Sequence, residues 1–295
     1  MTHIPVLIDE VIKIVNPKPG EFFIDGTLGN GGHAEEIIKR IAPDGVFLGI
    51  DWDKSAVEGA KIKLGEYGIR KIFLNENYAS LVDILQKYNL PKAEGLVLDL
   101  GFSSTQIEGS EKGFSFQKDE PLDMRYNQNE SRETAAEFVN RAAQSELARV
   151  LWEYGEEGQS RQIAKSIAEE RRKEKILTTK QLVDIIEKTK NRHGKIHPAT
   201  QTFQALRICV NQELENLKRV LREAEEIVEE GGRIAIISFH SLEDRIIKQE
   251  FKKIEKEGGG RRINKKVIHP SWEEVQKNPR SRSAKLRAIV MANKN

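Results

Sequence analysis

The stretch Asp25-Gly26-Thr27-Leu28-Gly29-Asn30-Gly31-Gly32-His33 decides the fold expected for this chain. It follows the short apolar run 22–24, which is typical of a buried strand, and precedes apolar residues at helical spacing, namely Ala34, Ile37, Ile38 and Ile41. Glycines let the backbone pass close to a ligand, and the first turn of a helix offers free N–H groups. The segment therefore predicts a strand, a ligand-binding glycine loop and a helix, in that order.

The same alternation of strand and helix continues through the first hundred residues. Apolar runs predict strands at 46–50, 71–74 and 95–100, and apolar residues at helical spacing predict helices at 56–64 and 81–88. Parallel strands joined by helices form a sheet that is covered on both faces. The sequence therefore predicts an α/β fold of the Rossmann-like type.

The alternation stops near residue 105 and resumes near residue 213. In the interval the patterns predict helices but no strand, and Thr178 with Gln181 forms a capping box before one of them. After it we expect a helix over 214–228 ended by Gly231-Gly232, a strand over 234–238, and late strands at 267–268 and 288–291. The prediction is an α/β domain over 1–104 and 213–295, with about seven mostly parallel strands. An all-helical domain over 105–212 is inserted into it, for substrate recognition.

The second expected strand ends at Asp51, twenty residues after Gly31. An acid at this place can accept hydrogen bonds from both ribose hydroxyls of a nucleoside, and ligands of open parallel sheets bind at this carboxyl edge. The geometry serves NAD and S-adenosylmethionine alike. However, the glycines at 26, 29, 31 and 32 do not fit the Gly-x-Gly-x-x-Gly fingerprint of dinucleotide sites. A nucleoside cofactor is expected, with an NAD-dependent oxidoreductase kept as the alternative.

The next two strands also end in residues suited to this edge. Tyr78 follows the third strand and could stack on an adenine or simply pack at a helix start. The fourth strand ends Asp99-Leu100-Gly101-Phe102-Ser103-Ser104. Amino-methyltransferases have an acid or Asn followed by Pro-Pro-aromatic here, and this chain has Asp99 and Phe102 but no prolines.

Composition and charge limit the possible partners. The chain has 48 basic and 46 acidic residues, and its net charge of +2 does not favour any class of partner. Residues 261–295 hold ten Lys or Arg against two Glu, as expected of either an RNA contact or a solvated tail. Cys209 is the only cysteine, so an intrachain disulfide and a Cys-rich zinc site are excluded. There is no leader pattern and no apolar stretch near 18 residues, so we expect a cytoplasmic protein without a membrane segment.

Eight groups of residues stand in the order found in a known family. They are Asn30-Gly31-Gly32-His33-Ala34 with Asp51, Asn77-Tyr78, Asp99–Gln106, Gly113-Phe114-Ser115-Phe116, Pro121-Leu122-Asp123-Met124-Arg125, His197-Pro198-Ala199-Thr200, Ser238–Arg245 and Arg280–Arg287. Together they resemble the ribosomal RNA small-subunit methyltransferase H family, also called MraW, over essentially the whole chain. The resemblance implies a class I methyltransferase that uses S-adenosylmethionine to methylate the exocyclic N4 of a cytosine. That cytosine lies in 16S ribosomal RNA, in the decoding centre of the small ribosomal subunit.

The resemblance also implies the site residues. The cofactor residues carried over are Gly31, Gly32, His33, Asp51, Tyr78, Asp99 and Gln106. For the substrate, Phe102 could stack on an unstacked base and Ser103 could accept from the amine, while Arg280, Arg282 and Lys285 suit phosphate contacts. No general base is assigned, and the histidines lack metal-ligand spacing. The remaining alternative is a catalytically idle RNA-binding assembly factor.

Overall fold

The computed structural model describes residues 5–101, 111–128, 132–190 and 197–292. The chain forms two compact units. The first is made of Met1–Gly101 and Leu214–Asn295, and the second of Phe102–Glu213. We call them the α/β unit and the helical unit.

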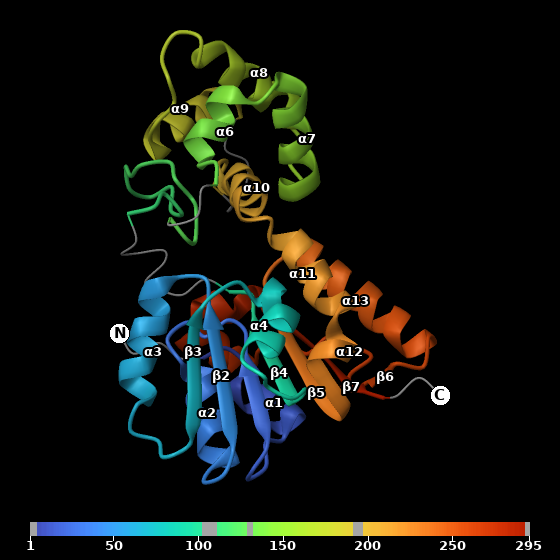
Figure 1. The fold of residues 1–295 in the computed structure, drawn as a ribbon. Coiled ribbons are helices and arrows are strands. Elements are labelled where there is room, and N and C mark those ends of the chain that lie inside the picture. The colour runs from blue at the N-terminus through green and yellow to red at the C-terminus, as the bar shows by residue number, and fades with distance from the viewer. Residues whose placement is uncertain (1–4, 102–110, 129–131, 191–196, 293–295) are drawn as a thin grey trace. The chain divides into compact units, whose positions relative to one another are not determined.

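The α/β unit is built on a seven-stranded sheet with the order β3-β2-β1-β4-β5-β7-β6 (Figure 1). Strands β1 to β5 are parallel, whereas β7 is antiparallel to both of its neighbours. The order reverses at β1 and β4, so the carboxyl ends of these strands form the switch point where α/β sheets bind ligands. This confirms the predicted fold class. The strands are β1 (Phe22–Asp25), β2 (Val46–Asp51), β3 (Arg70–Asn75), β4 (Ala93–Asp99), β5 (Val228–Ser238), β6 (Gly260–Arg262) and β7 (Lys285–Met291).

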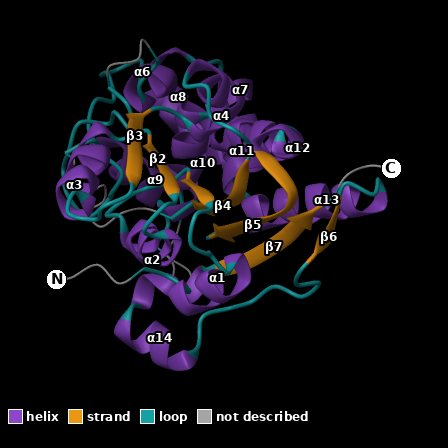
Figure 2. Ribbon diagram, turned by 60° about the horizontal axis from the view of Figure 1, so that its bottom comes forward, coloured by secondary structure: helices purple, strands orange, loops and turns teal. Residues whose placement is uncertain are grey.

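Helices cover both faces of the sheet, each over its own apolar core (Figure 2). One face is covered by α1 (Ile8–Val15), α2 (Gly32–Ile41) and α3 (Lys54–Leu64). The other is covered by α4 (Leu81–Lys87), α11 (Glu213–Arg222), α12 (Ala224–Ile227) and α13 (Ser241–Lys256). Alternate strand residues pack into the two cores, which is why the central strands read as continuous apolar runs.

The end of the chain differs from the prediction in one strand. Residues 267–268 do not form a strand; Ile268 makes an isolated bridge to Leu286, and the sixth strand is β6 instead. The reason is the side chain of Asn264, which donates to Leu286 O at 2.9 Å and accepts from Ala288 N–H at 2.7 Å. It occupies the edge of β7 where backbone pairing would otherwise continue from β6.

The helix expected over 214–228 is also shorter than predicted. Helix α11 ends at Arg222, the short α12 ends at Ile227, and β5 begins at Val228. Gly231 and its neighbour lie inside β5, where the register against β4 shifts between Ala93 and Gly95. Gly231 has φ +79°, a conformation that favours glycine, so the glycine pair forms an irregularity in a strand rather than a helix end.

The helical unit has an apolar core of its own. Its described helices are α6 (Ala135–Arg141), α7 (Gln144–Gly155), α8 (Ser160–Glu170), α9 (Thr179–Thr189) and α10 (Thr200–Asn211). The capping box of Thr178 and Gln181 is confirmed at the start of α9. Buried Asn211 fixes the loop before α6, because its amide donates to Met124 O at 2.8 Å and accepts from Tyr126 N–H at 3.0 Å.

Three described α-helices were not predicted from the sequence. They are α1, α13 and α14 (Trp272–Lys277), and the last lies beside α1, where Leu7 N–H donates to the Glu274 carboxylate at 2.8 Å (Figure 2). The short 3-10 helices η1 (Tyr78–Ser80) and η2 (Pro279–Ser283) complete the α/β unit. Within the described ranges, no helix is both long and apolar enough to span a membrane.

Candidate cofactor site

The glycine loop between β1 and α2 is held by the neighbouring strands. Gly26 N–H donates to Val97 O of β4 at 3.0 Å, and Leu28 N–H donates to Ile50 O of β2 at 2.9 Å. Gly29 and Gly31 have φ of +47° and +68°, where a side chain would be strained. On Gly29 a Cβ would find no atom closer than Thr27 O at 3.8 Å, so this side of the loop is open to a ligand.

Asp51 is fixed at the end of β2 by two backbone N–H groups. Its Oδ2 accepts from Gly29 at 2.8 Å and its Oδ1 from Asp53 at 2.8 Å. The side chain of Asn75, at the end of β3, donates to the carbonyls of Asp51 and Trp52 at 3.0 and 2.9 Å. Burial raises the pKa of Asp51 to about 6, against the effect of these hydrogen bonds. The carboxylate is therefore held in one orientation and is ionised at neutral pH.

Thr27 links the carboxyl ends of β1 and β4. Its Oγ1 accepts from Asp99 N–H at 2.6 Å, and its N–H donates to Asp25 Oδ1 at 3.1 Å. Asp25 is 2% exposed, and burial, followed by repulsion from Asp99 and Asp51, raises its pKa to about 7. Gly101 N–H donates to Asp99 Oδ1 at 3.1 Å. This network fixes where the Asp99 carboxylate lies.

His33 lies in the first turn of α2 and is 6% exposed. Its Nε2 is 3.0 Å from Val6 O, which can only accept, so Nε2 carries a proton. Its Nδ1 is 3.9 Å from Asp99 Oδ2. The hydrogen bond from the ring therefore ties the first turn of α2 to the segment before α1, and it leaves Nδ1 near the Asp99 carboxylate without a hydrogen bond between them.

Tyr78 opens η1 next to the glycine loop. Asn77 caps this short helix by accepting from Ala79 N–H at 2.9 Å. A Cβ on Gly26 would lie 2.5 Å from Leu98 Cδ2 and 3.1 Å from the Tyr78 Cβ, so glycine lets the loop pass close to both side chains. The half-buried Tyr78 also packs against the core on this face of the sheet.

Together these contacts bring Asp25, Asp51 and Asp99 to one edge of the sheet. Asp99 and Asp51 both raise the pKa of Asp25 through charge repulsion, so the three carboxylates share one electrostatic environment. Such an edge is rich in acceptors and carries negative charge. It fits a ligand with a positive centre and hydroxyl donors.

The comparisons with known proteins agree on one family. The model of the MraW methylase family matches residues 1–292. The chain belongs to the MraW methylase family. This confirms the resemblance drawn from the sequence motifs and removes the NAD-dependent oxidoreductase. S-Adenosylmethionine is the cofactor of this methylase.

Several relatives carry the same name, Ribosomal RNA small subunit methyltransferase H. The one from Dehalococcoides mccartyi is 45% identical, and the match covers 97% of this chain and 85% of that protein. Those from Clostridioides difficile and Coprothermobacter proteolyticus are each 42% identical, and the matches cover 97% of this chain and 97% and 95% of those proteins. The similarity therefore extends through both units of the methylase.

The predicted cofactor residues fall into two groups in the methylase. The structure brings six of them to the carboxyl edge of the sheet, namely Gly31, Gly32, His33, Asp51, Tyr78 and Asp99. Gln106 lies outside the described residues, as do the predicted substrate residues Phe102 and Ser103.

The basic residues near the end of the chain also lie at this edge. Arg280 and Arg282 belong to η2, where both are exposed, and Lys285 begins β7. Since β7 is antiparallel to β5 and Lys285 pairs with Ser238, the last residue of β5, the start of β7 lies at the carboxyl end of β5. The predicted phosphate-binding residues therefore share the edge that carries the carboxylates.

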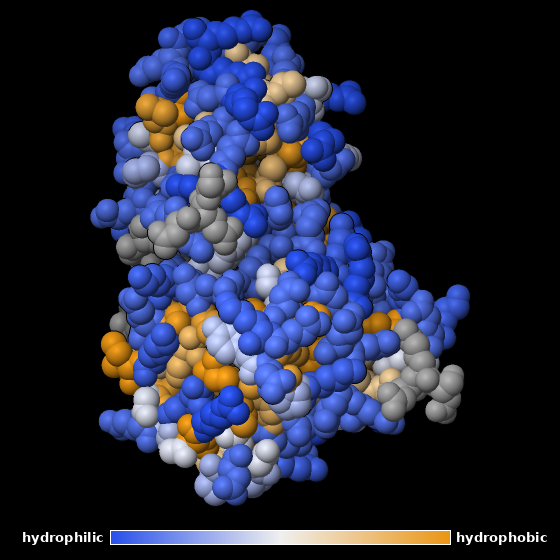
Figure 3. All heavy atoms as spheres, viewed as in Figure 1, coloured by the Kyte–Doolittle hydropathy of each residue, from blue (hydrophilic) through white to orange (hydrophobic). Residues whose placement is uncertain are grey.

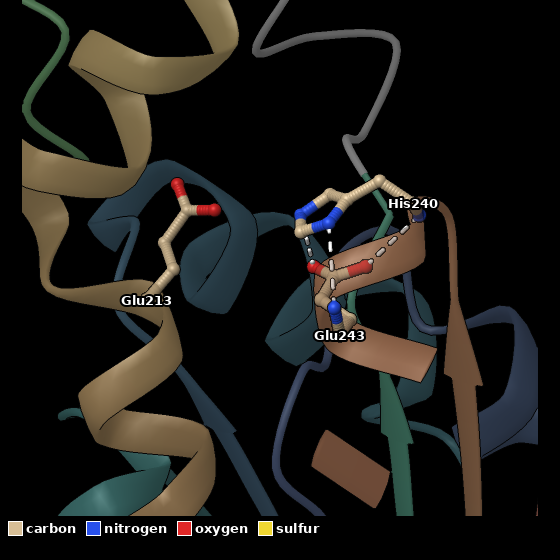
Figure 4. A group of neighbouring side chains, drawn as sticks. All are labelled: Glu213, His240 and Glu243. Carbon is tan, nitrogen blue, oxygen red and sulfur yellow. Dashed lines mark hydrogen bonds and ion pairs between the residues drawn. The ribbon is translucent and has the colours of Figure 1, made fainter. Parts of the chain in front are cut away.

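His240 follows the same edge and serves as the N-cap of α13 (Figure 4). Its Nδ1 accepts from Glu243 N–H at 3.4 Å, and the Glu243 carboxylate accepts from Phe239 N–H at 2.9 Å. The third residue drawn, Glu213, pairs with Arg207 through two contacts of 2.8 Å. The structure thus gives His240 a helix-capping role.

The sequence did not identify Asp25, Thr27 and Asn75 as site residues. Asp25 was visible as a strand-end acid, but its contacts depend on neighbours that are far away in the chain. Thr27 meets Asp99 N–H across 72 residues, and Asn75 meets Asp51 O across 24. Their common signal is a polar residue at or just after the end of a parallel strand.

Proposed function

We propose that this methylase transfers a methyl group from S-adenosylmethionine to the exocyclic N4 of a cytosine in the decoding centre of 16S ribosomal RNA. The proposal rests on the family, on relatives named Ribosomal RNA small subunit methyltransferase H, and on the site described above. The substrate would be small-subunit ribosomal particles in the cytoplasm.

Asp51 would recognise the ribose of the cofactor. Its two oxygens accept from backbone N–H groups and keep further lone pairs for the two hydroxyls. The open side of Gly29 and the start of α2 at Gly32 would receive the rest of the nucleoside and the amino-acid part, with His33, Tyr78 and Gln106 as further contacts. The negative edge formed with Asp25 and Asp99 suits the positive sulfonium.

The cofactor supplies a methyl group that is already activated by its sulfonium sulfur. The protein must then mainly hold the acceptor in line with that methyl group, about 3–3.5 Å away. The cytosine amine is a weak nucleophile because its lone pair is delocalised into the ring. Acceptors in the turn after β4, such as Ser103, would hold the amine protons, and Phe102 would stack on the flipped base.

The RNA backbone would be held by residues outside the cofactor pocket. Arg280, Arg282 and Lys285 would bind phosphates, because guanidinium groups offer paired donors to phosphate oxygens. The helical unit, predicted as a domain over 105–212, would recognise the surrounding RNA.

The observation that carries the proposal is the position of Asp51, held by Gly29 and Asp53 at the end of β2. The test is nucleoside mass spectrometry of 16S ribosomal RNA from cells with and without the gene. It should be combined with methyl transfer by the purified protein to small ribosomal particles that lack the modification. We expect loss of N4-methylcytidine, or of a doubly methylated product containing it, and restoration in vitro. Unchanged nucleosides and no transfer would show instead an idle assembly factor.

A further inference from the structure

The helical unit has a surface groove between α7 and the start of α8. The groove has a volume of about 980 Å³, within the range of about 300–1,000 Å³ that is common for ligand sites. It is lined on one side by residues of α7, including Arg149 and Trp152, and on the other by residues 158–162. All residues that line the groove belong to the helical unit, and none of them is a predicted cofactor residue.

Trp152 is the notable residue of this groove. Helix α7 buries Leu147, Val150 and Leu151 in the core of the unit, whereas Trp152 faces away from it and is 61% exposed. An exposed indole forgoes the burial that usually stabilises a tryptophan, so its ring is available to a partner. Figure 3 shows small apolar areas separated by hydrophilic side chains on the visible face of the helical unit, rather than one continuous apolar face.

The charged residues that line the groove are both arginines. Arg149 pairs with Glu153 at 2.6 Å but remains 52% exposed, and exposed Arg161 has no ion pair among the described residues. No carboxylate is found in the described lining, which otherwise holds amide and hydroxyl side chains, namely Gln144, Ser145, Gln159, Ser160 and Gln162. The groove thus offers an aromatic face, positive charge and neutral hydrogen-bonding groups.

We propose that this groove binds an unpaired segment of RNA, with one base stacked on Trp152 and its phosphates on Arg149 and Arg161. This combination is how proteins hold single-stranded nucleic acids, because every base has a face that stacks and every phosphate a negative charge. The inference rests on the proposed function, and it adds a second RNA contact to the basic residues at the sheet edge.

The test measures RNA binding and methyl transfer for matched variants of the full chain. The binding probe is a short unstructured RNA labelled with fluorescein, followed by anisotropy. Trp152→Ala should weaken binding about tenfold, since loss of one base stack corresponds to roughly five- to hundredfold, and Trp152→Phe should restore most of it. Leu177→Ala, which truncates another exposed apolar side chain of this unit, should leave binding unchanged.

The charges are tested in the same way. Arg149→Ala with Arg161→Ala should weaken RNA binding, whereas Lys165→Ala with Lys173→Ala removes the same charge from exposed positions that do not line the groove. If both double variants weaken binding equally, the effect is general charge and the groove has no part in it. Wild-type RNA affinity in Trp152→Ala, with an unchanged melting temperature, would overturn the inference.

Two further outcomes separate this inference from the proposed function. If the wild-type protein methylates ribosomal particles and Trp152→Ala does so with the same KM, the groove inference fails and the function stands. If Trp152→Ala impairs methylation of particles but not binding of protein-free RNA, the groove holds a ribosomal protein instead, and the inference also fails.

Discussion

Replacing Asp51 by Ala should weaken S-adenosylmethionine binding about a hundredfold. A hydrogen bond to a charged group contributes about 1.5–3 kcal/mol, and each 1.4 kcal/mol is about tenfold in affinity. Loss of two ribose contacts therefore corresponds to about 3–6 kcal/mol, of which water at the partly exposed carboxylate recovers a share. The change also removes the acceptor of Gly29 N–H, which loosens the glycine loop.

Calorimetric titration at two pH values tests this reasoning. Because the pKa of Asp51 is raised to about 6, wild-type affinity should fall as the pH drops below that value and the carboxylate is neutralised. The Asp51→Ala variant should bind S-adenosylmethionine weakly at both pH values, and its affinity should no longer depend on the titration of this carboxylate. Asp83→Ala, at an exposed position of α4, removes the same charge and should bind normally. If the folded Asp51→Ala variant bound S-adenosylmethionine with wild-type affinity, Asp51 would not be part of the cofactor site.

Three further changes test other parts of the structure. Burial raises the pKa of Asp25 from 3.8 to about 7, so the folded state binds this proton more tightly than the unfolded state does. The free energy of unfolding therefore falls as the pH rises through that range, by at most about 4 kcal/mol. In urea titrations of the cofactor-free protein, the wild type should lose more stability between pH 5.5 and 8 than Asp25→Asn, and parallel losses would contradict this assignment. Changing Arg280, Arg282 and Lys285 together to Ala should lower the salt slope of RNA binding by about two units, since each single-strand phosphate contact contributes about 0.7, and an unchanged slope would show a solvated surface. Residues 102–213 expressed alone should melt cooperatively by circular dichroism because their core is internal, and a broad, sloping melt would show that they depend on the rest of the chain.

The central strands were predictable because strands buried on both faces consist of consecutive apolar residues, which the local sequence shows directly. Strands β1 to β4 are apolar runs that end in an acid or Asn, and each was placed within two residues of its observed bounds. The late part of the sheet was less predictable. Asn264 replaces a strand pairing with side-chain hydrogen bonds, and an isolated Val-Ile pair gives no sign of that.

The candidate site also has a part that the sequence predicts and a part that it does not. Asp51 was expected from its spacing after the glycine loop, because the β–loop–helix unit fixes how far away the next strand ends. The contacts of Thr27 and the link from His33 to Val6 could not be expected, because they join segments that only the tertiary packing brings together. Spacing along the chain identifies which residues reach the edge of the sheet, but not which of them hold each other there.

The position of β7 has a consequence for how the protein is made. It is the last strand of the chain, yet it lies between β5 and β6, and β4 meets its neighbour β5 only after the whole helical unit has been synthesised. Translation proceeds from the N-terminus, at about 5–20 residues per second. The buried core of the helical unit is complete once Val210 has emerged, whereas β4 remains an open edge until β5 arrives. A chain released before Lys285 would lack a strand from the interior of its sheet and would expose β5 to aggregation.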